Sequence, residues 1–505
     1  MTPASPTTAL AYHQATKYTP ETIGNHPGLD WATQPPAFKR YAAEAPIRLA
    51  GFLPADPNPF TGEPATSEAE AAGGLTLAGL SRLIYAAYGI TGVIPQQPRP
   101  TYLRAAPSAG GLYPAELYVV VRDFPGLQPG LYGYHPLLHA LVLLWEDPAA
   151  ADALTRACYG NAQVAAAPVS LVVAGVFERS RWRYQERAYR RVLLDSGHLI
   201  GNALLVAPEL ELRVGLTAAF CDHRLGDLLR LDAAEEGALA VLPVNRPGDA
   251  ERPAWVALPS PTGHATVDAA TLAVLHRDSQ CGPDRPRLPA LGDEADEALH
   301  ARYGWTGGIS LLGDGLAPNP LFGRIQDTIC RRRSTRAYSG EAFTIDQFAR
   351  ILAAAYVPEE IRLHPQEGLV RDLLMTFIAI NGVDGLDDGV YYLAPHGLEL
   401  RLVRRGNVAQ ALQFLCLGQE LGGAAAAVVF HAADLATAVK RHGDRAYRYL
   451  HLDAGILGQR LNLAANAEDL GASGIGGFFD DHVTSLLGIP SEQAVIYVTT
   501  LGTPA

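Results

Sequence analysis

The sequence predicts an α+β protein that contains two tandem copies of one domain, each a mixed sheet flanked by helices, packed together as an intrachain pseudo-dimer. Residues 183–231 can be laid on residues 441–489 at a constant offset of 258 residues without a gap, and 16 of the 49 aligned positions are identical. Strand-like and helix-like patterns alternate in the same order in both halves. A chain of 505 residues also exceeds what one core supports and fits two domains of about 200–250 residues.

The first half starts with an arm over residues 1–45, rich in proline, tyrosine and tryptophan, which we expect to be extended rather than helical. The first domain, residues 46–260, is expected to follow a helix–strand order typical of a layered fold. Its predicted elements are a helix over 77–89, strands over 116–121 and 169–176, a hairpin over 130–136 and 140–145, a long helix over 189–212 and a strand over 239–244.

Proline, glycine and aspartate residues indicate a linker, placed at residues 261–320, that includes a helical piece over 268–277. The second domain, residues 321–505, repeats the order of the first. Its predicted elements are a helix over 347–356, strands over 373–380 and 424–430, a turn-rich hairpin segment over 385–395, and a long helix over 447–470 that ends with Gly471 as its C-terminal cap.

Composition excludes several classes of function. A net charge of −12 argues against nucleic acid and anionic membranes as partners, because both bind basic faces. No uncharged apolar run reaches 18 residues, and the N-terminus lacks a secretion pattern, so we expect a cytoplasmic protein. The five cysteines are scattered, without metal-ligand spacing, and are expected to be reduced and buried; no metal site is predicted. His198, inside an apolar helical run, is expected to be a packing residue.

Residues 331–338, RRRSTRAY, form a basic segment at the start of the second domain. Arginine presents a fork of donors and serine adds a short one, which suits a phosphate group. The alternative is a solvated basic run. The corresponding place in the first domain, near Arg48, carries no such run.

Two glycine-rich segments are the other candidates. Residues 107–114, PSAGGLYP, precede the first strand of the first domain, and residues 471–478, GASGIGGF, follow the long helix of the second. Bare backbone at these glycines allows close approach to a flat ligand. The alternatives are a tight turn and a flexible connector, and neither segment has the strand–helix context of a dinucleotide fingerprint. Each domain lacks the segment that the other keeps.

Taken together with the repeated helix sequences ERAYRRVLLDSGH and DRAYRYLHLDAG, GIGGFFDD and the arm DWATQPPAFKRY, these segments resemble the nitroreductase superfamily of flavoproteins. The chain is most similar to the SagB-type dehydrogenases, which include the azoline oxidases of peptide natural-product pathways. The resemblance implies an FMN-dependent oxidoreductase whose cofactor lies at a dimer interface and is held by both subunits. One chain with two degenerate copies would then hold one complete FMN site and could act as a monomer.

The resemblance also implies roles for individual residues. Those expected to hold the FMN phosphate and ribityl chain are Arg332, Ser334 and Arg336. Those expected to line the ring from the other half are Pro107, Ser108, Ala109 and Gly110. The amides expected to face flavin N5 are those of Gly476 and Gly477.

In azoline oxidases of this family a Lys-Tyr pair on the long helix is thought to take the substrate proton. The matching places here are Arg448-Tyr449 and, in the first copy, Arg190-Arg191. Arginine is a poor base because it stays protonated. We therefore expect Tyr449 or Tyr113 to serve as the proton donor.

Three functions follow as hypotheses. The first is an FMN enzyme that transfers hydride through N5 to or from a small or peptidic substrate, with NAD(P)H as one candidate reductant. Within that class, the alternative is a peptide-azoline dehydrogenase of a natural-product pathway. The second is a flavin-binding protein without turnover. The third is a scaffold that clamps peptides and binds no flavin.

Overall fold

The computed structural model describes residues 7–25, 28–41, 46–53, 74–96, 100–247, 271–283, 308–313, 316–357, 373–394 and 398–505. Most of the predicted linker, 261–320, and the second-copy counterpart of the PSAGGLYP turn, 364–372, lie outside these residues. Within them, no helix combines the length and apolarity needed to cross a bilayer.

Each half of the molecule contains a seven-stranded sheet, and the two sheets have equivalent strand orders, β1-β6-β5-β4-β7-β9-β8 and β10-β15-β14-β12-β16-β18-β17. The first sheet consists of β1 (Ile47–Arg48), β4 (Ala115–Val121), β5 (Gly130–His135), β6 (Ala140–Glu146), β7 (Val169–Val176), β8 (Arg213–Val214) and β9 (Glu236–Asn245). The second consists of β10 (Gly308–Ser310), β12 (Leu374–Ile380), β14 (Gly389–Ala394), β15 (Glu399–Arg405), β16 (Ala427–Ala433), β17 (Gly471–Ile475) and β18 (Ala494–Gly502).

Two small two-stranded sheets complete the strands described. They are the hairpin of β2 (Ile90–Ile94) with β3 (Thr101–Arg104), and the pair of β11 (Phe343–Thr344) with β13 (Val383–Asp384). This last pair is parallel, as is the isolated bridge between Tyr18 and Phe479. The fold class is confirmed, but the expected mixed sheets are wrong in one respect, because both large sheets pair in antiparallel fashion throughout.

The helices of the second half follow the same order as those of the first, with α11 added before them. In the first half they are α3 (Leu77–Tyr88), α4 (Ala150–Ala157), α5 (Ala162–Ala166), α6 (Phe177–Tyr184), α7 (Ala188–Val206) and α8 (Asp222–Leu229). In the second they are α11 (Ile325–Arg331), α12 (Ile345–Tyr356), α14 (Ala409–Leu415), α15 (Glu420–Ala424), α16 (Leu435–His442), α17 (Ala446–Ala467) and α18 (Asp480–Leu487). Helix α12 starts at a capping box in which Thr344 and Gln347 satisfy each other's backbone N–H groups.

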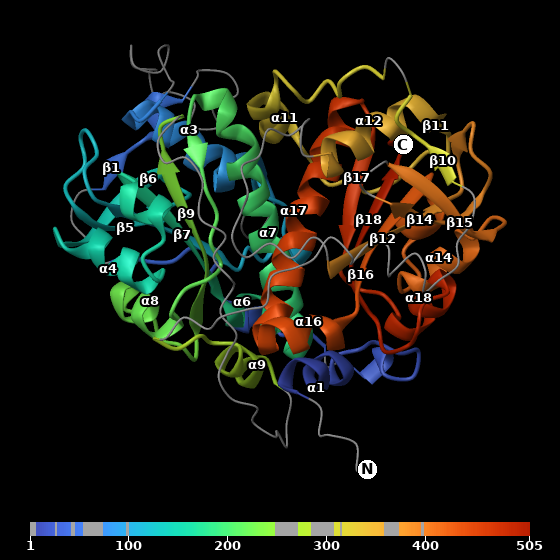
Figure 1. Ribbon diagram of the computed structural model, residues 1–505, viewed down its shortest axis with the longest axis horizontal. Coiled ribbons are helices and arrows are strands. Elements are labelled where there is room, and N and C mark those ends of the chain that lie inside the picture. The colour runs from blue at the N-terminus through green and yellow to red at the C-terminus, as the bar shows by residue number, and fades with distance from the viewer. Residues whose placement is uncertain are drawn as a thin grey trace.

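The two long helices, α7 and α17, lie side by side at the centre of the molecule, between the two sheets (Figure 1). Nearly every residue of both is buried, because each helix contacts its own sheet and the other helix. They cross at Gly197 and Gly455, which are equivalent positions in the repeat. A Cβ on either glycine would lie within 2.9 Å of the other's Cα, so only glycine permits this approach.

Two short helices outside the repeated core contact the two long helices in matching ways. Helix α1 (Thr8–Ala15) and helix α9 (Leu272–Asp278) lie near each other at one end of the molecule (Figure 1). Arg190 of α7 donates to the carbonyl of His13 at 2.8 Å, and Arg448 of α17 donates to the carbonyl of His276 at 2.8 Å. The expectation of an arm without helix is therefore wrong for residues 8–15. We propose that α9, assigned to the linker from the sequence, opens the second copy as α1 opens the first.

Two matched ion clusters join the halves. Asp480 accepts from Arg187 at 2.7 Å and from Arg190 at 2.8 Å, and all three side chains are at most 3% exposed. In the equivalent place Asp222 pairs with Arg445 and, at 2.6 Å, with Arg448. Although burial raises the pKa of Asp480, its two arginine partners bring that pKa below the usual value.

Candidate active site

The PSAGGLYP segment folds as a turn that wraps around the carboxyl group of Asp195. Gly110 and Gly111 have φ of 64° and 66°, a region that glycine enters without strain. The Ser108 hydroxyl donates to Asp195 Oδ2 at 2.5 Å and accepts from the Tyr113 N–H at 2.8 Å. The Ala109 N–H also donates to the Asp195 carboxyl, at 3.2 Å. The conformation of the turn is thus stabilised by Asp195, a residue of the long helix α7.

Burial raises the pKa of Asp195 to about 7, against the opposing effects of Ser108, Ala109 and Arg191. The native state therefore retains a proton on Asp195 at pH values where the unfolded chain has lost it. By linkage, this group stabilises the fold most below pH about 4, and the contribution is lost as pH rises toward 7.

We expect Asp195→Asn to remove this dependence. The difference in free energy of unfolding, wild type minus variant, should fall between pH 5 and pH 8, measured by denaturant unfolding of the flavin-free protein. For Asp480→Asn the same difference should instead rise as the pH increases through the acid range, because the pKa of Asp480 is lowered in the folded protein. A wild-type advantage that grows toward pH 8 would contradict the placement of the Asp195 proton.

The glycine-rich segment of the second half faces the same turn. Residues 471–475 form β17, an edge strand paired with β18, and not the flexible connector or helix cap considered from the sequence; α17 ends earlier, at Ala467. The carbonyl of Gly476, just beyond the strand, accepts from Arg191 of α7 at 3.2 Å. A Cβ on Gly476 would lie 3.6 Å from Arg191 Nε. The second half's glycines and the first half's long helix are therefore in contact.

The basic segment lies between β17 and the strand that leads into the turn. The Thr335 N–H donates to Ala472 of β17 at 3.0 Å. Arg332 is 4% exposed and donates to the carbonyl of Ala105 at 3.1 Å, to that of Arg104 at 3.4 Å, and to the Ser334 hydroxyl at 3.4 Å. Burial lowers the pKa of Arg332 to about 10. Within the described residues, no carboxylate pairs with this buried guanidinium.

The structure therefore brings most of the predicted cofactor residues to one seam between the halves. From the first half it contributes the turn of Pro107, Ser108, Ala109 and Gly110, and from the second Arg332, Ser334, Gly476 and Gly477. Arg336 is exposed beside them and adds positive charge next to Arg332.

The two predicted proton donors are placed differently. Tyr113 follows the turn, and its hydroxyl accepts from the Arg104 N–H at 3.2 Å while its ring stacks on the Arg104 guanidinium. Tyr449 is not at this seam. It is fully buried against Arg445 and His442, and burial raises its pKa far above the usual value. The residue that contacts Gly476 is Arg191 of α7, which occupies in the first copy the position that Tyr449 occupies in the second.

Four residues at the seam were not predicted as site residues; they are Tyr184, Tyr497, Asp195 and Arg191. Tyr184 at the end of α6 reaches the turn, since a Cβ on Gly110 would meet its hydroxyl at 2.8 Å. Tyr497 of β18 lies beneath Gly474, and its hydroxyl bonds to His198 at 2.8 Å. His198 also bonds to Gln459, as a packing histidine should, and burial lowers its pKa to about 4. Asp195 and Arg191 carried a signal, because both lie in the repeated helix sequence.

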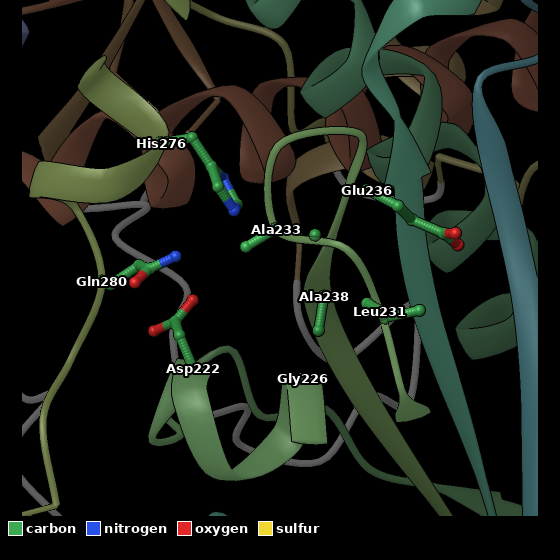
Figure 2. Close-up of a pocket in the computed structure, with 9 residues that line it drawn as sticks. Asp222, Gly226, Leu231, Ala233, Glu236, Ala238, His276 and Gln280 are labelled. Atoms are coloured by element: carbon green, nitrogen blue, oxygen red, sulfur yellow. The ribbon is translucent and has the colours of Figure 1, made fainter. Parts of the chain in front are cut away.

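The other seam is filled by α9 and the residues after it. Asp222, Arg445 and Arg448 contact the segment 276–281 there, through Ser279, His276 and Cys281. A cavity of ≈ 30 Å³ remains between α8, β9 and this segment, with Asp222 and His276 pointing into it (Figure 2). That volume is enough to hold water.

Comparison with known proteins identifies the domain. Residues 71–245 and 329–503 each match the nitroreductase family.

The chain belongs to the nitroreductase family.

The predicted resemblance to the nitroreductase superfamily and its SagB-type branch is confirmed, and the protein is a flavin-dependent oxidoreductase with two nitroreductase domains. A crystal structure of a nitroreductase from Anabaena variabilis is 42% identical, covers 99% of this chain and all of that one, and superposes with a TM-score of 0.87. The two-domain arrangement is therefore shared over the whole length.

Curated relatives match about a third of this chain or less. The nitroreductase-like protein MJ1384 of Methanocaldococcus jannaschii is 34% identical over 34% of this chain and 81% of its own length. The microcin B17-processing protein McbC of Escherichia coli is 29% identical over 27% of this chain. The trifolitoxin-processing protein TfxB of Rhizobium leguminosarum is 32% identical over 28%. The chain spans 52% of McbC and 39% of TfxB.

Proposed function

We propose that this nitroreductase holds one FMN in the seam where the turn 107–111 of the first half meets Arg332 and Gly476 of the second, and that it reduces or oxidises a small or peptidic substrate there. When bound, FMN supplies hydride transfer at its N5. The observation that carries the proposal is the buried Arg332 guanidinium, which contacts both halves and has no carboxylate partner among the described residues. A phosphate would provide the missing anion.

The other residues at the seam fit a flat ring beside that phosphate. Gly476 and Gly477 have no side chain to exclude it, and Ser108 is fixed by Asp195. Arg336, exposed nearby, supplies a cation where negative charge would accumulate on a reduced ring. Tyr113 and Tyr184 are the phenols nearest the turn, and we propose them in place of Tyr449 as candidate proton donors. NAD(P)H remains a candidate reductant.

Loss of the cations should release the cofactor. Arg332→Ala combined with Arg336→Ala removes two charge-assisted contacts, so the Kd for FMN should rise about 100-fold or more. Arg48→Ala, at the matching place in the first half, should leave the Kd unchanged. Fluorescence titration of the flavin-free proteins with FMN measures both. Equal weakening by Arg48→Ala would overturn the assignment to this seam.

A peptide-azoline dehydrogenase is the second candidate, favoured by the similarity to McbC and TfxB. The seam argues against it, because Arg191 stands where a proton-accepting residue would be required. Incubation of the FMN-loaded protein with an azoline-containing peptide decides the point, since oxidation to the azole lowers the peptide mass by two hydrogens.

A further inference from the structure

Three arginines, Arg187, Arg190 and Arg191, lie at the start of α7, and among them Arg191 alone forms no ion pair within the described chain. Arg187 and Arg190 both bind Asp480, and the second copy keeps both as Arg445 and Arg448 bound to Asp222. At the position of Arg191 the second copy has Tyr449, so packing of this helix does not require an arginine there. A buried charge that the fold does not need indicates a ligand.

The guanidinium of Arg191 is held in a fixed position at the site. It stacks on the Tyr184 ring, 3.9 Å from its centroid, and donates to the carbonyls of Arg187 at 3.3 Å and Gly476 at 3.2 Å. Asp195 lies one turn along α7, but its oxygens accept from Ser108 and Ala109. Arg191 therefore keeps its charge at the glycines with no carboxylate bound to it in the described chain.

A second arginine flanks the same tyrosine. Arg183 lies 5.8 Å from the Tyr184 ring centroid and is exposed, and its Cδ would be 3.2 Å from a Cβ on Gly110. Arg181, two residues earlier, pairs with Glu186 at 3.0 Å, whereas no ion pair of Arg183 occurs among the described residues. Tyr184 thus has one buried and one exposed guanidinium near its ring, Arg191 beside Gly476 and Arg183 beside Gly110.

We infer that Arg183 and Arg191 bind the carboxylate of the substrate, so that this protein, acidic overall, acts on an anionic organic molecule. This inference rests on the proposed flavin site. Arginine presents paired donors that match a carboxylate. The protein's charge of −12 would repel anions elsewhere, so this pair would set where and how they dock.

The test compares two acceptors of similar shape, 4-nitrobenzoate and 4-nitrobenzyl alcohol, with the FMN-loaded protein reduced by dithionite under anaerobic conditions. Each nitro group takes two electrons and two protons from the reduced flavin and loses water to give the nitroso product. The ratio of kcat/KM for the acid to that for the alcohol should fall about tenfold or more in Arg191→Gln. It should fall less in Arg183→Gln, and Arg191→Lys should restore part of it. Arg181→Gln is the matched control and should leave the ratio unchanged.

Binding gives a second readout that needs no turnover. Unreactive benzoate should bind the oxidised wild type more tightly than benzyl alcohol in calorimetry, and Arg191→Gln should remove that preference. Equal ratios in wild type and both Gln variants, with flavin content unchanged, would overturn the carboxylate assignment alone. An effect confined to reduction by NADPH would overturn it too, in favour of a nucleotide phosphate. A wild type that takes up no FMN would overturn the proposed function and this inference together.

Discussion

Asp480→Ala is expected to lower the free energy of unfolding by about 3–5 kcal/mol, because it leaves Arg187 and Arg190 buried without their shared counterion. Both guanidinium groups would then face a protein interior that cannot hydrate them. The loss should be measurable by chemical denaturation of the flavin-free protein, and Asp222→Ala should produce a comparable loss at the equivalent cluster.

The neighbouring Asp481→Ala is the matched control. Asp481 is 48% exposed and pairs with Lys17 at 2.6 Å, so its removal should cost about 1 kcal/mol or less. Equal costs for Asp480 and Asp481 would mean that the buried cluster does not join the two halves as described.

Gly197→Ala is expected to destabilise the protein by about 3 kcal/mol, since the new methyl group would meet backbone atoms of the facing helix. It would lie 2.8 Å from the Gly455 Cα and closer still to the Leu452 carbonyl oxygen. Neither atom belongs to a flexible side chain, so α7 and α17 would have to separate. Thermal and denaturant unfolding both report the change.

Gly226→Ala supplies the control for this substitution. Gly226 lies within α8, and a Cβ there would meet nothing within 4 Å. Alanine should therefore stabilise the protein by about 0.5–1 kcal/mol through its better helix propensity. A loss from Gly226→Ala as large as that from Gly197→Ala would contradict the close helix crossing.

Much of the fold was predictable because the repeat preserves residues that both halves need. The pairs Arg187 and Arg445, and Asp222 and Asp480, are identical at the constant offset, and all prove to be buried in the ion clusters. Their identity was visible in the sequence, but their pairing was not, since each aspartate binds arginines of the opposite half. These contacts join residues that lie far apart in the sequence, one in each half, so no local spacing of residues predicts them.

The errors have similar physical causes. GASGI has one β-branched residue, Ile475, and no aromatic residue, so little in it marks a strand, and it pairs as an edge strand because β18 provides the partner. Helix α1 is short and has a weak apolar face, so its burial against Arg190 and Tyr447 decides its conformation. Tyr449 lies against Arg445 and His442, and the equivalent residue of the first copy, Arg191, is the one that contacts Gly476.

The count of flavins per chain tests the central claim most directly. Saturating the purified protein with FMN, removing the excess, and measuring bound flavin against protein concentration should give one FMN per 505-residue chain. Two FMN per chain, or none, would contradict a single site assembled from both halves.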